Sequence, residues 1–315
     1  MAIIQTESFE TNIATLPTAN SLDIGVASVG TKIYLFGGAK GADRSNTINI
    51  FDTENNTITT LNTTLPTAAS SFGVASVGTK IYLFGGNYSN TSNRLNTINV
   101  FDTENNTITT LSTKLPKQLN GIKAASVGAK IYLFGGFNYQ TGKIDTINVF
   151  DTENNTITTL NTTLPTALFA FGIASVGTKI YLLGGQDTAA SDTINIFDTE
   201  NNTITTSSIK LPTAYYSMGA GCVETKICLF GGYGGAYLDT INIFDTENNT
   251  ITTSNIKLPT ACYSMGVGSV GTKIYLFGGY GGSAGYLSTT HCYTPEGIFA
   301  DEENTTKTII TYNGN

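Results

Sequence analysis

The chain alternates short apolar runs with polar turns, and the same pattern returns along its whole length. In Lys32–Phe36 (KIYLF) every position after the lysine is apolar, which indicates a strand buried on both faces. Segments rich in Val, Ile and Thr flank it, and Gly, Asp and Asn bound each segment. One unit therefore predicts four strands, at residues 25–29, 32–36, 47–51 and 57–61, which form one antiparallel sheet.

Two markers count the units independently. Leu-Pro pairs recur every 47 to 50 residues, with prolines at Pro17, Pro66, Pro116, Pro165, Pro212 and Pro259. Gly-Gly pairs begin at Gly37, Gly85, Gly135, Gly184, Gly231 and Gly278. A four-stranded sheet with two apolar faces must stack on its neighbours, and radial stacking closes without long exposed edges. The sequence therefore predicts an all-β fold, a six-bladed β-propeller of four-stranded antiparallel blades.

The unit resembles the kelch repeat, in which a strand ends in Gly-Gly and a later strand carries an aromatic residue followed by Asp. The matching residues are Gly37-Gly38 and Phe51-Asp52, with Ile58 in the family's Trp position. The family's common Arg after Pro is Thr67 or Lys117 here, so a ligand mode based on a ring of arginines is not expected. The resemblance implies a propeller that binds partners, without naming the ligand.

The two ends of the chain are expected to meet in the last blade of a single domain that spans residues 1–315. Residues 1–16 align with a fourth strand that has no preceding three, so they predict the outer strand that closes blade six. Residues 17–296 form the six kelch-like repeats, and residues 297–315 form a C-terminal tail. The segment 304–312 in that tail is also strand-like, so it is an alternative candidate for the same place or an extra strand.

Comparison of the six copies predicts one variable face. The turns SVGTK and DTENNT are nearly constant, whereas the loops between strands two and three, and those after each Leu-Pro, differ in every copy. In an up-and-down blade both variable sets emerge on the same face, where loops on a rigid scaffold commonly carry function. The candidate binding residues are Tyr88, Arg94, Phe137, Tyr139, Tyr215, Tyr216, Tyr233, Tyr237, Tyr263, Tyr280 and Tyr286. Packing in the channel entrance is an equal alternative for Phe169, Phe171, Tyr215, Tyr216 and Tyr263.

Composition narrows the partners. A net charge of -7 with only 16 scattered Lys and Arg residues argues against a nucleic-acid surface. The first residues lack the basic and apolar regions of a signal peptide, and no apolar run is long enough for a membrane span, so a cytoplasmic location is the default expectation. The four cysteines show no disulfide or metal spacing and are expected to be reduced.

Residues for catalysis or metal binding are sparse, so we expect no catalytic site, no metal and no cofactor. His291 is the only histidine, and it stands where the other blades carry Asn, which favours a structural role. The DTENN turns lack the ligand spacing of a calcium loop, and Asx-type turn chemistry accounts for them.

The predicted function is a non-catalytic scaffold that recognises a protein, peptide or glycan through the aromatic loops. Two alternatives remain open. The near-identical copies and the 12% charged residues also suit a virion or surface-adhesion component. A sialic-acid mutarotase-like sugar enzyme shares the kelch architecture but needs a general acid or base in the channel. The sequence leaves the oligomeric state open.

Overall fold

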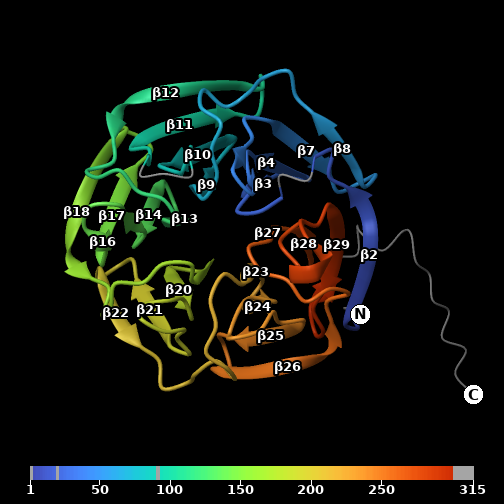
Figure 1. Cartoon of the computed structure of the whole chain (residues 1–315). Coiled ribbons are helices and arrows are strands. Elements are labelled where there is room, and N and C mark those ends of the chain that lie inside the picture. Colours follow the sequence, from blue (N-terminus) through green and yellow to red (C-terminus); the bar gives the residue numbers. More distant parts are fainter. Residues whose placement is uncertain (1–2, 19–20, 90–92, 301–315) are drawn as a thin grey trace, which may run out of the picture.

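The protein forms a ring of six sheets. The computed structural model describes residues 3–18, 21–89 and 93–300. In this part of the chain, six four-stranded antiparallel sheets are arranged as blades around a common axis (Figure 1). The helical residues described are one 3-10 turn, Gly282–Ala284. The predicted all-β, six-bladed propeller is confirmed.

The strands of successive blades occupy equivalent positions. The first, innermost strands are β3 (Gly25–Val29), β9 (Gly73–Val77), β13 (Lys123–Val127), β19 (Gly172–Val176), β23 (Gly219–Val223) and β27 (Gly266–Val270). The second strands are β4 (Lys32–Phe36), β10 (Lys80–Phe84), β14 (Lys130–Phe134), β20 (Lys179–Leu183), β24 (Lys226–Phe230) and β28 (Lys273–Phe277). The third strands are β7 (Ile48–Asp52), β11 (Thr97–Asp102), β17 (Thr146–Asp151), β21 (Ile194–Asp198), β25 (Thr240–Asp245) and β29 (Thr289–Thr294). The outer strands are β8 (Thr57–Thr60), β12 (Thr107–Lys114), β18 (Thr156–Thr163), β22 (Thr203–Thr206), β26 (Thr250–Lys257) and β2 (Ser8–Thr15).

The core lies between adjacent blades, which explains the continuous apolar pattern of the second strands. Phe101, on the third strand of blade two, packs edge-on against Phe36 of blade one, with 5.5 Å between the ring centroids. Phe51 of blade one packs in the same way against Phe277 of blade six at 5.4 Å. All four of these rings are fully buried. Each blade therefore buries both faces of its second strand against its neighbours.

The ring closes through the N-terminal strand, as predicted. Strand β2 pairs antiparallel with β29 and completes the sheet of blade six. Leu16 of this segment is buried. Phe9 packs on the apolar cluster between blades five and six, and Ile13 packs on the cluster between blades six and one. The short strands β1 (Ile3–Ile4) and β30 (Phe299–Ala300) also pair with each other. The proposed strand at 304–312 lies outside the described residues.

The repeated DTENN turn is built by its own side chains. The Asp52 Oδ1 atom accepts the backbone N–H of Glu54 at 2.9 Å, and Asn56 adopts a left-handed backbone with φ 57°. The same Asp-to-Glu bond recurs in four further blades. Because Asn tolerates this conformation better than most residues, the turn explains the Asn-Asn pair without a bound cation.

His291 links the closing strand to blade six. Its Nδ1 atom accepts the backbone N–H of Asn12 at 3.3 Å, so the ring proton lies on Nε2, which contacts Thr289 Oγ1 at 3.0 Å. The ring also packs against Phe9, with 5.5 Å between centroids. A second proton would face the Asn12 N–H donor, so this arrangement favours the neutral imidazole. Burial likewise lowers the pKa of His291.

The free energy of unfolding is therefore expected to depend on pH through His291. Above a pH of about 6.5 the imidazole is neutral in the folded and unfolded chain, and the stabilisation is complete. Below that pH the unfolded chain takes up the proton more readily, so the stabilisation declines as pH falls toward the lowered folded-state pKa. His291→Asn installs the residue of the other blades and should flatten the urea-unfolding profile between pH 7.5 and 5. Identical slopes in the two proteins would contradict this role.

Candidate functional site

Each blade presents three aligned loop positions on one face. In each blade, a residue just before the first strand pairs with the residue that follows Gly-Gly. That residue pairs in turn with one near the end of the loop between the second and third strands, which we call the return position. In blade five these positions are Tyr216, Tyr233 and Tyr237. Both variable loop sets therefore interlock on the same side of the ring, which we call the loop face. The remaining blades carry Leu22/Ala39/Arg44, Ser70/Asn87/Arg94, Asn120/Phe137/Lys143, Phe169/Gln186/Ala190 and Tyr263/Tyr280/Tyr286.

Blades five and six carry tyrosine at all three positions. We call these six residues the tyrosine platform: Tyr216, Tyr233, Tyr237, Tyr263, Tyr280 and Tyr286. The Tyr237 and Tyr263 rings are stacked, with centroids 5.6 Å apart and an interplanar angle of 14°. Tyr280 contacts Tyr286 at 5.0 Å, and further contacts at 5.5 to 6.4 Å join the rest into one cluster. Such offset and edge-on contacts stabilise the cluster and fix the ring positions.

The platform is fixed to the ring and still accessible. Tyr286 Oη accepts the backbone N–H of Gly41 in blade one at 2.8 Å, which ties blade six to its neighbour. Tyr237 keeps 38% of its surface exposed. Burial and the neighbouring tyrosines raise the pKa of Tyr263, so its hydroxyl stays protonated and can donate a hydrogen bond. The platform therefore offers apolar ring surface together with phenolic hydroxyl groups.

Blades one to three carry a basic residue at the return position, and we call Arg44, Arg94 and Lys143 the basic arc. The Arg94 guanidinium lies over the Phe137 and Tyr139 rings at 5.5 and 5.7 Å, and its Nε donates to Asn120 Oδ1 at 2.9 Å.

The other two members of the basic arc are also held in place. Arg44 donates to the Gly41 carbonyl at 2.9 Å. Lys143 lies over the Phe169 ring at 5.6 Å and forms an ion pair with Asp187 at 3.4 Å. The loop face therefore has a tyrosine-rich part on blades five and six and a part that carries basic residues on blades one to three, where Phe137 and Tyr139 also lie.

The remaining candidates fall in two environments. Tyr88 and Tyr139 are exposed at 40% and 63%, at the tips of the loops in blades two and three. Tyr215 is buried at 1% exposure, and the Asn242 amide donates to its hydroxyl at 3.0 Å. Tyr215 is therefore a core residue, and its inclusion among the contact residues is wrong because its side chain points between blades. Phe171 is fully buried as well, which favours packing for that residue.

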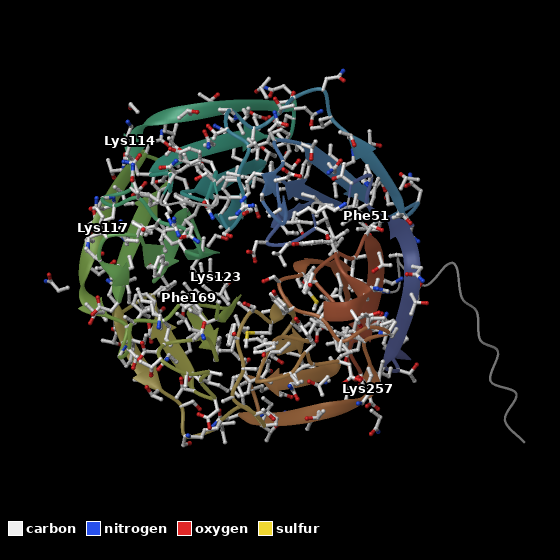
Figure 2. All side chains as sticks on the ribbon, in the orientation of Figure 1. Phe51, Lys114, Lys117, Lys123, Phe169 and Lys257 are labelled. Carbon is white, nitrogen blue, oxygen red and sulfur yellow. The ribbon has the colours of Figure 1, made fainter. Side chains whose placement is uncertain are left out.

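Two charged residues that the sequence analysis did not single out lie at or just before the start of a first strand, at its loop-face end. Asp23 stands where the other blades carry Ser, Gly or Ala, and Lys123 stands where the other five carry Gly. Figure 2 shows Lys123 near the inner margin of the ring, whereas Lys114 and Lys117 lie toward the outside. Alignment of the copies at the start of each first strand would have exposed both departures.

The described residues hold no group of three or more His, Cys, Asp or Glu side chains arranged for a metal ion. The four cysteines are free thiols, and burial raises the pKa of Cys262 and Cys292 to about 12, so both stay protonated and unreactive. None of the described segments is a helix with the length and apolar character needed to cross a bilayer.

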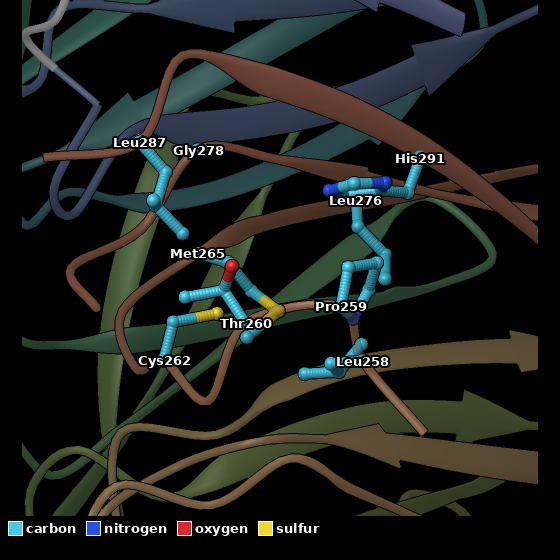
Figure 3. Close-up of a pocket in the computed structure, with 9 residues that line it drawn as sticks. All are labelled: Leu258, Pro259, Thr260, Cys262, Met265, Leu276, Gly278, Leu287 and His291. Atoms are coloured by element: carbon cyan, nitrogen blue, oxygen red, sulfur yellow. The ribbon is translucent and has the colours of Figure 1, made fainter. Parts of the chain in front are cut away.

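Two cavities differ in what they can hold. The first lies beside His291, Leu276 and Pro259 at the junction of blades five and six and has a volume of about 10 Å³ (Figure 3). That space suits about one water molecule. The second has about 340 Å³ along the channel and is lined by first-strand residues such as Ser28, Ile173 and Gly221. Of these two cavities, the channel cavity has room for a small organic molecule.

The radial sheets, the terminal closing strand and the variable loops on one face define a repeat-built β-propeller. A family model described as the KLHDC2/KLHL20/DRC7 Kelch-repeats domain matches residues 23–203 and 170–312. These segments cover most of the chain, so the protein belongs to the kelch-repeat family, in agreement with the resemblance seen in the sequence. A search of curated proteins finds no match. Kelch propellers typically serve as protein-interaction scaffolds and are generally non-catalytic.

Proposed function

We propose that the protein binds a partner protein on its loop face, with the tyrosine platform as the main contact and the basic arc as a charged rim. The observation that carries this proposal is the concentration of tyrosine at all six aligned positions of blades five and six. Buried tyrosines at an interface contribute large apolar area and a hydrogen bond at low entropic cost. Positions that serve only packing would not require a hydroxyl at every one.

The arrangement also indicates the kind of partner surface. Interface energy concentrates in central aromatic residues, whereas charged rims mainly steer association and select partners. The basic arc lies on blades one to three, next to the platform around the ring. A partner with an apolar patch bordered by acidic residues fits both parts of the loop face.

Substitution at the platform should weaken partner binding strongly. Tyr237 is the platform member with an exposed ring, and its loss removes contact area without a core cavity. For a central aromatic contact we expect Tyr237→Ala to weaken binding about 30-fold, equivalent to about 2 kcal/mol. The measurement is a dissociation constant for a partner identified by photo-crosslinking from position 237.

The matched control lies on the face of the propeller opposite the loop face. Asn105→Ala changes an exposed residue of a constant turn and should leave partner affinity unchanged. Equal effects of the two variants would refute a loop-face site. A glycan-array signal that disappears with Tyr237→Ala would assign the platform to carbohydrate, and turnover of free sialic acid would establish the enzyme alternative.

A further inference from the structure

The two faces of the ring differ in charge. We call the face opposite the loop face the turn face, because the constant turns between strands one and two and between strands three and four form it. In blade one, the turn face carries Lys32 and the carboxylates of Asp52 and Glu54. Blades two to five repeat this set and Glu224 joins it in blade five, so these blades hold eleven acidic side chains and five lysines. The turn face therefore has an excess of six negative charges.

The loop face has the opposite sign on blades one to three. Four basic side chains lie there besides the basic arc: Lys40, Lys114, Lys117 and Lys123. The acidic side chains of the same segments are Asp23, Asp43 and Asp145, and Asp187 of blade four pairs with Lys143. This part of the loop face therefore has an excess of three positive charges.

The innermost zone of each face is apolar. The first strands lie closest to the axis of the ring (Figure 1). Tyr216 and Tyr263 precede the first strands β23 and β27, so they form the inner part of the tyrosine platform. On the turn face every first strand ends in valine, and all but Val223 are half-buried: Val29, Val77, Val127, Val176, Val223 and Val270. Aromatic rings on one face thus correspond in radial position to aliphatic side chains on the other.

The charged zones also correspond in radial position. Arg44 and Arg94 precede the third strands β7 and β11, whereas Asp52 and Asp102 end the same two strands on the turn face. When two rings stack on one axis, the valines of one face the inner tyrosines of the other, and the carboxylates face the basic arc. The chain itself therefore offers the surface expected of a loop-face partner, an apolar patch bordered by acidic residues.

The acidic turn recurs around the ring, so this match does not require one particular rotation. The turn uses the backbone N–H of Glu54, and in the described part of the chain the exposed Glu54 carboxylate has no hydrogen bond or ion pair. The glutamates of blades two to five are equivalent. At any rotation, at least two of the three blades opposite the basic arc present such a turn.

Two copies can meet face to face in three ways. Contact between two turn faces sets acidic side chains against each other, and contact between two loop faces joins surfaces that both carry excess positive charge. Juxtaposed like charges disfavour association, whereas complementary charges select the partner. Of the three contacts, the one between a loop face and a turn face joins opposite charges.

We propose that the loop face of one ring binds the turn face of a second copy, so that the protein associates head to tail. A second copy is then the partner of the loop face, and the inference rests on the function proposed above. Because the two contact surfaces differ, the contact is heterologous and leaves one loop face and one turn face exposed, to which further copies add.

Sedimentation equilibrium of the purified protein tests the self-association. In about 0.05 M salt and up to about 1 mM protein, the mean mass should rise with concentration beyond twice the 33.3 kDa of one chain. In about 1 M salt the screening length falls to about 3 Å, so the association constant should drop at least about 10-fold. A mass of 33.3 kDa at every concentration would overturn the proposal. A mass that stops at the dimer would assign a closed contact between like faces and overturn it as well.

Charge reversal identifies the two faces. The loop-face variant combines Lys40→Glu, Lys114→Glu and Lys117→Glu, all at exposed positions. The turn-face variant carries Glu→Lys at all five exposed turn positions: Glu54, Glu104, Glu153, Glu200 and Glu247. Each variant alone should associate at least about 10-fold more weakly, because like charges then meet. A mixture of the two should regain the association, since each supplies the face that the other has lost.

The control for the turn-face variant places lysines on the rim of the ring. It carries Thr→Lys at five exposed positions of the outer strands: Thr59, Thr109, Thr158, Thr205 and Thr252. This control should associate like the unmodified protein. A turn-face variant that associates normally, or a mixture that stays monomeric, would overturn head-to-tail contact.

Photo-crosslinking from position 237 separates this inference from the proposed function. In the purified protein at low salt, the crosslink should join position 237 to a turn-face segment of a second copy. Capture of a different protein by a chain that stays monomeric would overturn self-association and leave partner binding in place. No crosslink to any protein would contradict both. The Asn105→Ala control applies to a copy that contributes its loop face to an unmodified turn face.

Discussion

Removal of residues 1–16 is expected to cost about 5 kcal/mol of unfolding free energy, enough to unfold much of the ring at 37 °C. The N-terminal segment supplies buried Leu16 and the packed side chains of Phe9 and Ile13, and loss of one large core side chain alone costs about 2–5 kcal/mol. The deletion also leaves β29 as an unpaired edge, which invites association between chains. Because small folded proteins have only about 5–15 kcal/mol in total, this loss is severe. Urea unfolding and light scattering measure the two effects.

A peptide of residues 1–16 added in trans provides the control. It should restore the unfolding midpoint of the shortened chain, because the strand needs no covalent link to pair with β29. The same peptide with Phe9→Ala and Leu16→Ala should fail. Truncation after Ala300 tests the alternative closing segment and should have a small effect. A loss from that truncation equal to the loss from removing residues 1–16 would contradict closure by β2.

The strands were predictable because six copies repeat one pattern. The expected ranges 47–51 and 57–61 differ by one residue from Ile48–Asp52 and Thr57–Thr60. Strand length, by contrast, depends on neighbours. The sequence TITTLNTTLP occurs in blades one and three, yet the outer strand ends at Thr60 in one and at Thr163 in the other. Identical sequence in the outer strand cannot predict this difference. In blade one Ser45 Oγ accepts the Thr47 N–H at 3.1 Å, whereas the equivalent Thr146 of blade three pairs with Thr163 of the outer strand.

The loop face was predictable in outline, because its loops differ between the six copies whereas the turns of the other face are nearly constant. Its division into a tyrosine platform and a basic arc depends on which loop residues pair after each Gly-Gly, and this register is set in three dimensions. Tyr215 and Tyr216 are adjacent, so their types alone do not show which one points inward. The equivalents of Tyr215 in two other blades, Leu119 and Leu168, are buried and apolar, and this comparison would have placed Tyr215 in the core.

The second large effect is expected from the first glycine of each Gly-Gly pair. Gly37 has φ 61°, and a Cβ atom there would lie 2.2 Å from the Ala69 carbonyl oxygen of the next blade. That oxygen already accepts the Gly38 N–H at 3.1 Å. Gly37→Ala must therefore push the two blades apart and weaken this bond, in addition to the strain of a left-handed alanine. We expect a loss of about 4 kcal/mol, the sum of about 1–2 for the backbone and about 1–3 for overpacking.

Gly30→Ala separates the two contributions. Gly30 has φ 59°, nearly the same as Gly37, but a Cβ atom there would meet nothing within 4 Å. This variant should cost only the backbone strain, about 1–2 kcal/mol. Because both variants exchange the same atoms at the same φ, the difference between their urea-unfolding free energies measures how tightly adjacent blades approach. Equal losses in the two variants would mean that the junction can yield, and the Gly-Gly pair would then be required for its turn conformation alone.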